Sequence, residues 1–139
     1  MGQLAQFTTH HPLLIAGLLA AWAAVLFYEI RLRRTTLTHI TSADAVRLIN
    51  KGAIVVDVRK PEEFQAGHIV NARNIVLDRI EGEDDALSKQ KNKVLVTVCD
   101  NGASAGRAAN LLRKAGFANV FSLKGGLTGW RADNLPLVK

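Results

Sequence analysis

Cys99 is the only cysteine of the chain and the first residue whose type and position indicate chemistry. It follows an apolar, β-branched run at 94–98, and a loop of small residues at 100–104 leads from it into an apolar pattern with helical spacing. This order predicts a strand, a tight turn and a helix, with the thiol at the carboxyl edge of a parallel sheet, where sites form. The start of a helix attracts anions and favours a thiolate. Cys99 is therefore a candidate nucleophile or sulfur carrier facing an anion pocket, against the plainer alternative of an inert buried thiol.

The elements around this turn alternate between strands and helices from residue 42 onward. We expect helices at 42–51, 62–66 and 103–115 and strands at 53–58, 73–76, 93–98 and 120–123. Over 77–90 we expect a loop followed by a helix, and Gly125 and Gly126 turn the chain into a last short segment. This alternation predicts an α/β domain over 41–139, with a small parallel sheet flanked by helices on both faces.

A different kind of segment precedes that domain. After a short polar N-terminus at 1–11, an apolar run at 12–30 is long enough to span a bilayer, and a basic linker at 31–40 follows it. A buried core helix that is apolar on every side is rare in so small a domain, and a cleaved signal peptide would carry its positive charge before the run. We therefore expect one transmembrane helix. Because arginines after such a run stay inside, we expect the N-terminus outside the inner membrane and the domain in the cytoplasm.

Composition excludes several other classes. One cysteine allows no internal disulfide and no cysteine-based zinc site, and the four histidines have no metal-ligand spacing, so we expect no metal and no cofactor. The net charge of +6 is concentrated partly beside the apolar run, and there is no basic stripe with interleaved aromatic residues. We therefore expect no binding to nucleic acid.

Four motifs in order resemble the rhodanese family of sulfurtransferases over about residues 40–135. They are Asp57-Val58-Arg59 with Pro61-Glu62-Glu63-Phe64; Gly67-His68-Ile69 with Asn71-Ala72 and Asn74-Ile75; Cys99-Asp100-Asn101-Gly102; and Leu111-Leu112-Arg113-Lys114-Ala115-Gly116-Phe117 with Gly125-Gly126 and Trp130. The arrangement of one anchor and one domain resembles the membrane-anchored single-domain bacterial members. A phosphatase of the related type is not expected, because its arginine would stand where this chain has Ala105.

The resemblance implies a rhodanese-like fold and a persulfide chemistry. Cys99 would accept a sulfane sulfur from thiosulfate or a protein persulfide and pass it to a thiol, cyanide or a protein acceptor. The loop would hold the anionic sulfur with converging backbone N–H groups. Its residues are Asp100, Asn101, Gly102, Ala103 and Ser104.

This loop departs from the family pattern in its charge. It contains no cation, Ser104 stands where an arginine is common, and Asp100 is acidic. The carboxylate should disfavour the thiolate and repel an anionic donor, so we expect weak activity on thiosulfate. The same departure supports the main alternative, a catalytically weak or inactive module that binds a partner at the membrane. A third hypothesis is a redox sensor in which Cys99 is oxidised.

Three further residues are candidates for supporting roles. Asp57 and Arg59 follow a strand end and are expected either to reach the pocket or, in the plainer interpretation, to brace the neighbouring loop as an ion pair. Arg107, one turn into the helix, is the nearest cation along the chain after Cys99. For His68 we expect a structural hydrogen bond rather than acid–base chemistry. The sequence indicates no oligomeric state.

Overall fold

The computed structural model describes residues 11–36, 38–81 and 85–139, and the chain divides into two units, Met1–Leu37 and Thr38–Lys139. In the first unit, α2 spans Pro12–Thr36 and so continues past residue 30 into the segment expected to be a linker. Its stretch Pro12–Arg31 is long and apolar enough to cross a membrane, and none of that stretch is buried. The polar N-terminus expected at 1–11 lies, except for His11, outside the described residues.

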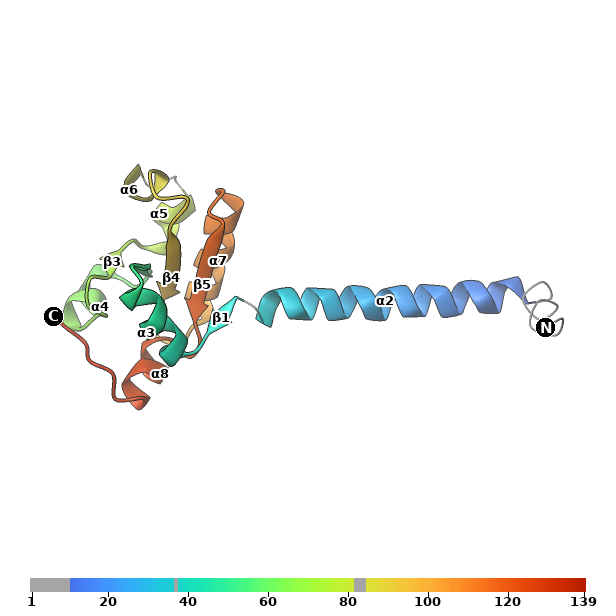
Figure 1. The fold of residues 1–139 in the computed structure, drawn as a ribbon, viewed down its shortest axis with the longest axis horizontal. Coiled ribbons are helices and arrows are strands. Elements are labelled where there is room, and N and C mark those ends of the chain that lie inside the picture. The colour runs from blue at the N-terminus through green and yellow to red at the C-terminus, as the bar shows by residue number, and fades with distance from the viewer. Residues whose placement is uncertain (1–10, 37, 82–84) are drawn as a thin grey trace. The chain divides into compact units, whose positions relative to one another are not determined.

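The second unit contains short strands alternating with helices (Figure 1). Its elements are β1 (His39–Ile40), α3 (Ser42–Asn50), β2 (Ile54–Asp57), α4 (Pro61–Ala66), β3 (Arg73–Asn74), α5 (Leu77–Glu81), α6 (Asp85–Ser88), β4 (Val94–Val98), α7 (Ala103–Lys114), β5 (Asn119–Leu123) and α8 (Gly126–Ala132). The five strands form one sheet in the order β1-β5-β4-β2-β3, and every neighbouring pair is parallel. The predicted α/β fold with a parallel sheet is confirmed.

The core lies on both faces of this sheet because successive strand residues point to opposite sides. Val56 and Leu95 belong to one apolar cluster, together with residues of α5 and α7. Their neighbours Val55 and Val96 belong to the other, together with residues of α3 and α8. Burial on both faces explains why the central strands are apolar without alternation.

Two local predictions differ from the structure. The segment expected to be a linker contains β1, which pairs with β5, and no local pattern marks a strand of two residues. Over 77–90 the expected loop is instead helix α5 at its start, because Leu77 and Ile80, three residues apart, pack on the cluster that contains α7. Part of this segment, 82–84, lies outside the described residues.

Candidate functional site

The site forms where β2 and β4 end side by side. The two strands are parallel neighbours, with Asp57 in register with Val98, and the Val58 N–H donates to the Val98 carbonyl at 2.9 Å. Because carboxyl ends of parallel strands meet at one edge, the loops that follow them converge. One of these loops carries Arg59 and the other carries Cys99.

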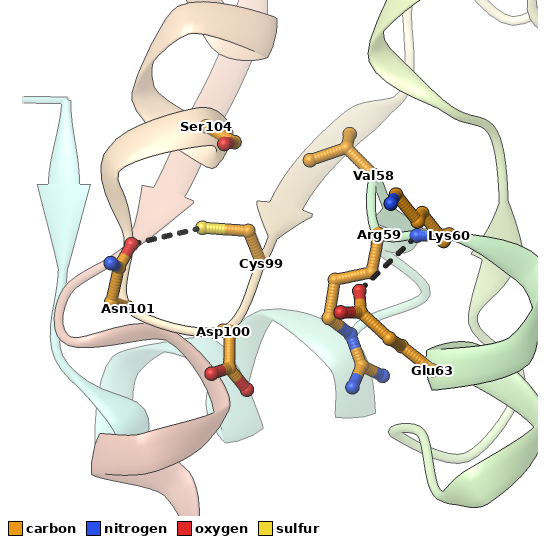
Figure 2. Close-up of a pocket in the computed structure, with 8 residues that line it drawn as sticks. All are labelled: Val58, Arg59, Lys60, Glu63, Cys99, Asp100, Asn101 and Ser104. Carbon is orange, nitrogen blue, oxygen red and sulfur yellow. Dashed lines mark hydrogen bonds between the residues drawn. The ribbon is translucent and has the colours of Figure 1, made fainter.

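A cavity of about 280 Å³ lies between these two loops (Figure 2). Its lining residues are Val58, Arg59, Lys60, Glu63, Cys99, Asp100, Asn101 and Ser104. Five of the predicted site residues are therefore brought together here. Val58, Lys60 and Glu63 were not predicted as site residues, although their position just after a strand adjacent to the Cys99 strand is a signal that could have found them.

Cys99 lies at this cavity with only 4% of its surface exposed. Its Sγ accepts the Gly102 N–H at 3.0 Å and lies 3.9 Å from Asn101 Oδ1 (Figure 2). Gly102 is the N-cap of α7 and has a φ of 97°, a conformation that glycine adopts without strain. The expected contact between the thiol and the start of a helix is thus present in the structure.

Other backbone amides of the Cys99 loop and of the first turn of α7 are without hydrogen-bond partners among the described residues. Asn101 Oδ1 accepts the Ala103 N–H at 3.1 Å and so satisfies one donor at the helix start. Within the described part of the chain, hydrogen-bond partners are absent for four other N–H groups, those of Asp100, Asn101, Ser104 and Ala105. Unpaired N–H groups at the start of a helix are suited to hold an anion.

The Nε and Nη2 atoms of Arg59 are held by buried hydrogen bonds. Its Nε and Nη2 donate to the Asp57 carboxylate at 3.0 and 2.7 Å, and Nη2 also donates to the Gly67 carbonyl at 2.8 Å. The hydrogen bond to Asp57 raises the pKa of Arg59, so the guanidinium stays charged. Nη1 has no hydrogen bond to any described residue and remains available in a residue that lines the cavity.

Asp100, which the sequence suggested would place negative charge near the thiol, lines the cavity. Figure 2 shows its carboxylate pointing away from the sulfur of Cys99. Together with Glu63, Asp100 adds to the effect of Asp57 and raises the pKa of Arg59. Lys60 is exposed, and its ammonium has no ion pair with any carboxylate that the structure describes. The cations that line the cavity therefore come from the neighbouring loop, at Arg59 and Lys60.

Other predicted residues lie outside the cavity lining. Arg107 is exposed on α7, Asp57 is buried beneath Arg59, and Ala103 is exposed at the first position of α7. The His68 ring nitrogen Nδ1 lies 2.9 Å from the Phe64 carbonyl, and the His68 backbone pairs with Val138. These contacts agree with the structural roles weighed above for Asp57 and His68.

Comparison with known proteins assigns the fold. Residues 41–133 match the model of the rhodanese-like domain. The chain is 39% identical over 141 residues to the uncharacterized protein YibN of Escherichia coli, which covers 100% of this chain and 99% of that protein.

Two further relatives match the domain. The chain is 37% identical over 97 residues to thiosulfate sulfurtransferase GlpE of Pseudomonas aeruginosa, covering 70% of this chain and 86% of that protein. Among solved structures, a rhodanese-related protein of Thermoplasma volcanium superposes with a TM-score of 0.65 at 29% identity, over 72% of this chain and 96% of the other. With the fold, the Cys99 loop and these matches in agreement, the chain belongs to the rhodanese-like family.

Proposed function

We propose that this protein is a sulfurtransferase that carries a sulfane sulfur on Cys99. The observation that carries the proposal is the environment of the sulfur. Cys99 Sγ lies at a cavity and accepts the Gly102 N–H at 3.0 Å, and the loop that follows has N–H groups that no described residue pairs with. Such donors stabilise a thiolate and the anionic persulfide formed from it.

The reaction needs no cofactor to balance. The Cys99 thiolate attacks the outer sulfur of thiosulfate, forming a Cys99 S–S bond while the S–S bond of thiosulfate breaks and sulfite leaves with the electron pair. A thiolate or cyanide then attacks the outer sulfur of the persulfide and regenerates the Cys99 thiolate. A protein persulfide donor gives the same Cys99 product, with a protein thiolate as leaving group.

The charges around the cavity support binding of an anionic donor by the loop that follows β2. The Arg59 guanidinium is paired with Asp57 but keeps its Nη1 donor without a partner among the described residues. The Lys60 ammonium forms no ion pair with a carboxylate that the structure describes, and the Asp100 carboxylate points away from the sulfur. Asp100 and Glu63 still place negative charge at the rim, which weakens the attraction of a dianion such as thiosulfate. We therefore propose that the activity on thiosulfate is weak and that a protein persulfide also serves as a sulfur donor.

The α2 helix supports a place at the inner membrane. Its apolar stretch Pro12–Arg31 is followed by Arg33 and Arg34, and such residues stay on the cytoplasmic side. The proposal is a single-pass anchor with the N-terminus outside and the rhodanese-like domain in the cytoplasm. Deleting residues 1–34 should release the protein from membranes, and a truncated protein that still sediments with them would contradict the anchor.

The test is to load the full chain with sulfur in detergent. The protein is incubated with thiosulfate or with a protein persulfide, and its intact mass is measured. We expect the added mass of one sulfur atom, removed by cyanide and absent in Cys99→Ser. A folded protein that takes no sulfur from either donor would overturn the proposal in favour of a module that binds a partner at the membrane.

A further inference from the structure

The β5–α8 turn braces the backbone of the Cys99 loop. The Leu127 N–H donates to the Cys99 carbonyl at 2.9 Å, and the Thr128 N–H donates to the Asp100 carbonyl at 3.0 Å. In a trans peptide the carbonyl and the following N–H point in opposite directions, and no peptide of the described chain is cis. Holding both carbonyls on α8 therefore directs the N–H groups of Asp100 and Asn101 away from α8.

Gly126 allows this close approach. A Cβ placed there would lie 2.6 Å from the carbonyl carbon of Asp100 and would also collide with the Cys99 carbonyl oxygen. Its φ of 56° adds backbone strain for a residue such as alanine. A side chain at position 126 would thus push directly on the two residues that begin the Cys99 loop.

The same turn is held from its other side by β1. The Ser122 N–H donates to the Thr38 carbonyl at 2.7 Å, and the Lys124 N–H donates to the Ile40 carbonyl at 2.9 Å, two residues before Gly126. Ile40 packs on the apolar cluster that contains Leu127. Strand β1 is therefore the outer support of the turn that braces Cys99.

His39 gives β1 a second route to the loop. Its Nδ1 lies 2.6 Å from Ser122 Oγ, and its Cε1 would lie 3.3 Å from a Cβ on Gly106. The Gly106 N–H donates to the Gly102 carbonyl in the first turn of α7. Strand β1 thus contacts both supports of the loop, the first turn of α7 and the β5–α8 turn.

We propose that β1 and Gly126 are positioning elements for sulfur transfer, with β1 fixing the β5–α8 turn and Gly126 fixing the peptides of the Cys99 loop. The proposal rests on the function proposed above. Strand β1 begins at His39, shortly after α2 ends at Thr36. The segment that follows the apolar helix along the chain would therefore belong to the support of the Cys99 loop.

The first test compares Gly126→Ala with Gly52→Ala in the full chain. Both glycines have positive φ, 56° and 92°, but a Cβ at position 52 meets nothing within 4 Å. The rate of sulfur loading and the pH profile of Cys99 alkylation by iodoacetamide are measured. Because small misplacements of reacting groups are costly, we expect Gly126→Ala to slow loading about tenfold, and Gly52→Ala by less than about twofold.

The alkylation profile separates this proposal from the proposed function. Displacing the Gly102 N–H from the sulfur should move the profile of Gly126→Ala to higher pH, since the thiolate loses a donor. This shift is expected even if no donor loads the protein, in which case the proposed function fails and the positioning role stands. Equal profiles and equal loading rates for the two variants would overturn the role of Gly126.

The second test addresses β1 through His39→Ala. Its control is Arg73→Ala, an exposed side chain on β3, the strand at the opposite edge of the sheet. We expect His39→Ala to slow loading about threefold and to speed hydrogen exchange over 100–106, with no such change in Arg73→Ala. If the two variants behave alike, β1 has no part in positioning the loop.

Discussion

Two loops leave neighbouring strands at the same edge of the sheet, and they differ in what their polar groups do. After β2, Arg59 is largely satisfied by Asp57 and Gly67, and Asn74 Nδ2 donates to the Arg59 carbonyl at 2.8 Å. After β4, the Cys99 loop keeps several N–H groups without a partner among the described residues. The first loop holds its polar groups in buried contacts, whereas the second leaves donors beside the cysteine that we propose as the sulfur carrier.

This difference shows how a small domain can hold backbone N–H groups in position without pairing them. Unpaired backbone donors are unfavourable in a buried loop unless water or a ligand meets them. Here the loop borders a cavity, and α8 fixes the carbonyls of Cys99 and Asp100. The N–H groups of Asp100 and Asn101 meanwhile have no partner among the described residues. Rigidity on one side of the cavity and open donors on the other is the arrangement that an anionic sulfur requires.

The largest expected effect is a loss of stability when Arg59 loses its ion-pair partner Asp57. Asp57→Ala leaves the Arg59 guanidinium, 7% exposed, without its buried partner, which should cost about 3–5 kcal/mol of unfolding free energy. Urea denaturation followed by the fluorescence of buried Trp130, in a Trp22→Phe background, measures this loss. Arg47→Ala, which breaks the exposed pair with Asp44, is the control and should cost less than about 1 kcal/mol. Equal losses would show that the pair after β2 has no special structural role.

The next effect concerns the charge of the Cys99 loop. Asp100→Arg replaces a carboxylate at the cavity rim with a cation and should raise kcat/KM for thiosulfate about fivefold at low salt. Asp100→Asn, which removes charge without reversing it, should give a smaller increase, and both gains should shrink in high salt. Steady-state assays with cyanide as acceptor measure them. An unchanged or slower rate in Asp100→Arg would refute the electrostatic argument.

The smallest expected effect comes from the cation on the opposite loop. Lys60→Met should lower kcat/KM for thiosulfate about threefold, because an exposed ammonium attracts an anion only moderately. Lys51→Met removes an exposed lysine that does not line the cavity and should leave the rate unchanged. If the two variants have the same rate, Lys60 takes no part in receiving the donor.

The sequence predicted those features that are local in the chain. A β-branched run, one cysteine and small loop residues predicted the Cys99 turn, and the apolar spacing of Ala105, Ala108 and Leu112 predicted α7, where all three are buried. The carboxyl edge of a parallel sheet followed from the alternation of strands and helices.

Other features depend on contacts between distant segments. Strand β1 has two residues and exists through pairing with β5, more than 80 positions later, so no local pattern could mark it. The place of Lys60 and the direction of the Asp100 side chain depend on how two loops meet across the cavity. For the same reason Arg107, close to Cys99 along the chain, is not among the residues that line the cavity.

If Cys99 carries sulfur as proposed, the loaded protein must also release that sulfur to an acceptor. The full chain is loaded with sulfur, freed of donor and mixed with cyanide in a single turnover. The amount of thiocyanate formed is then compared with the amount of loaded Cys99. We expect one thiocyanate per loaded cysteine, with return to the unloaded mass and no product from Cys99→Ser. Sulfur that stays on the protein, or equal thiocyanate from Cys99→Ser, would contradict the proposal.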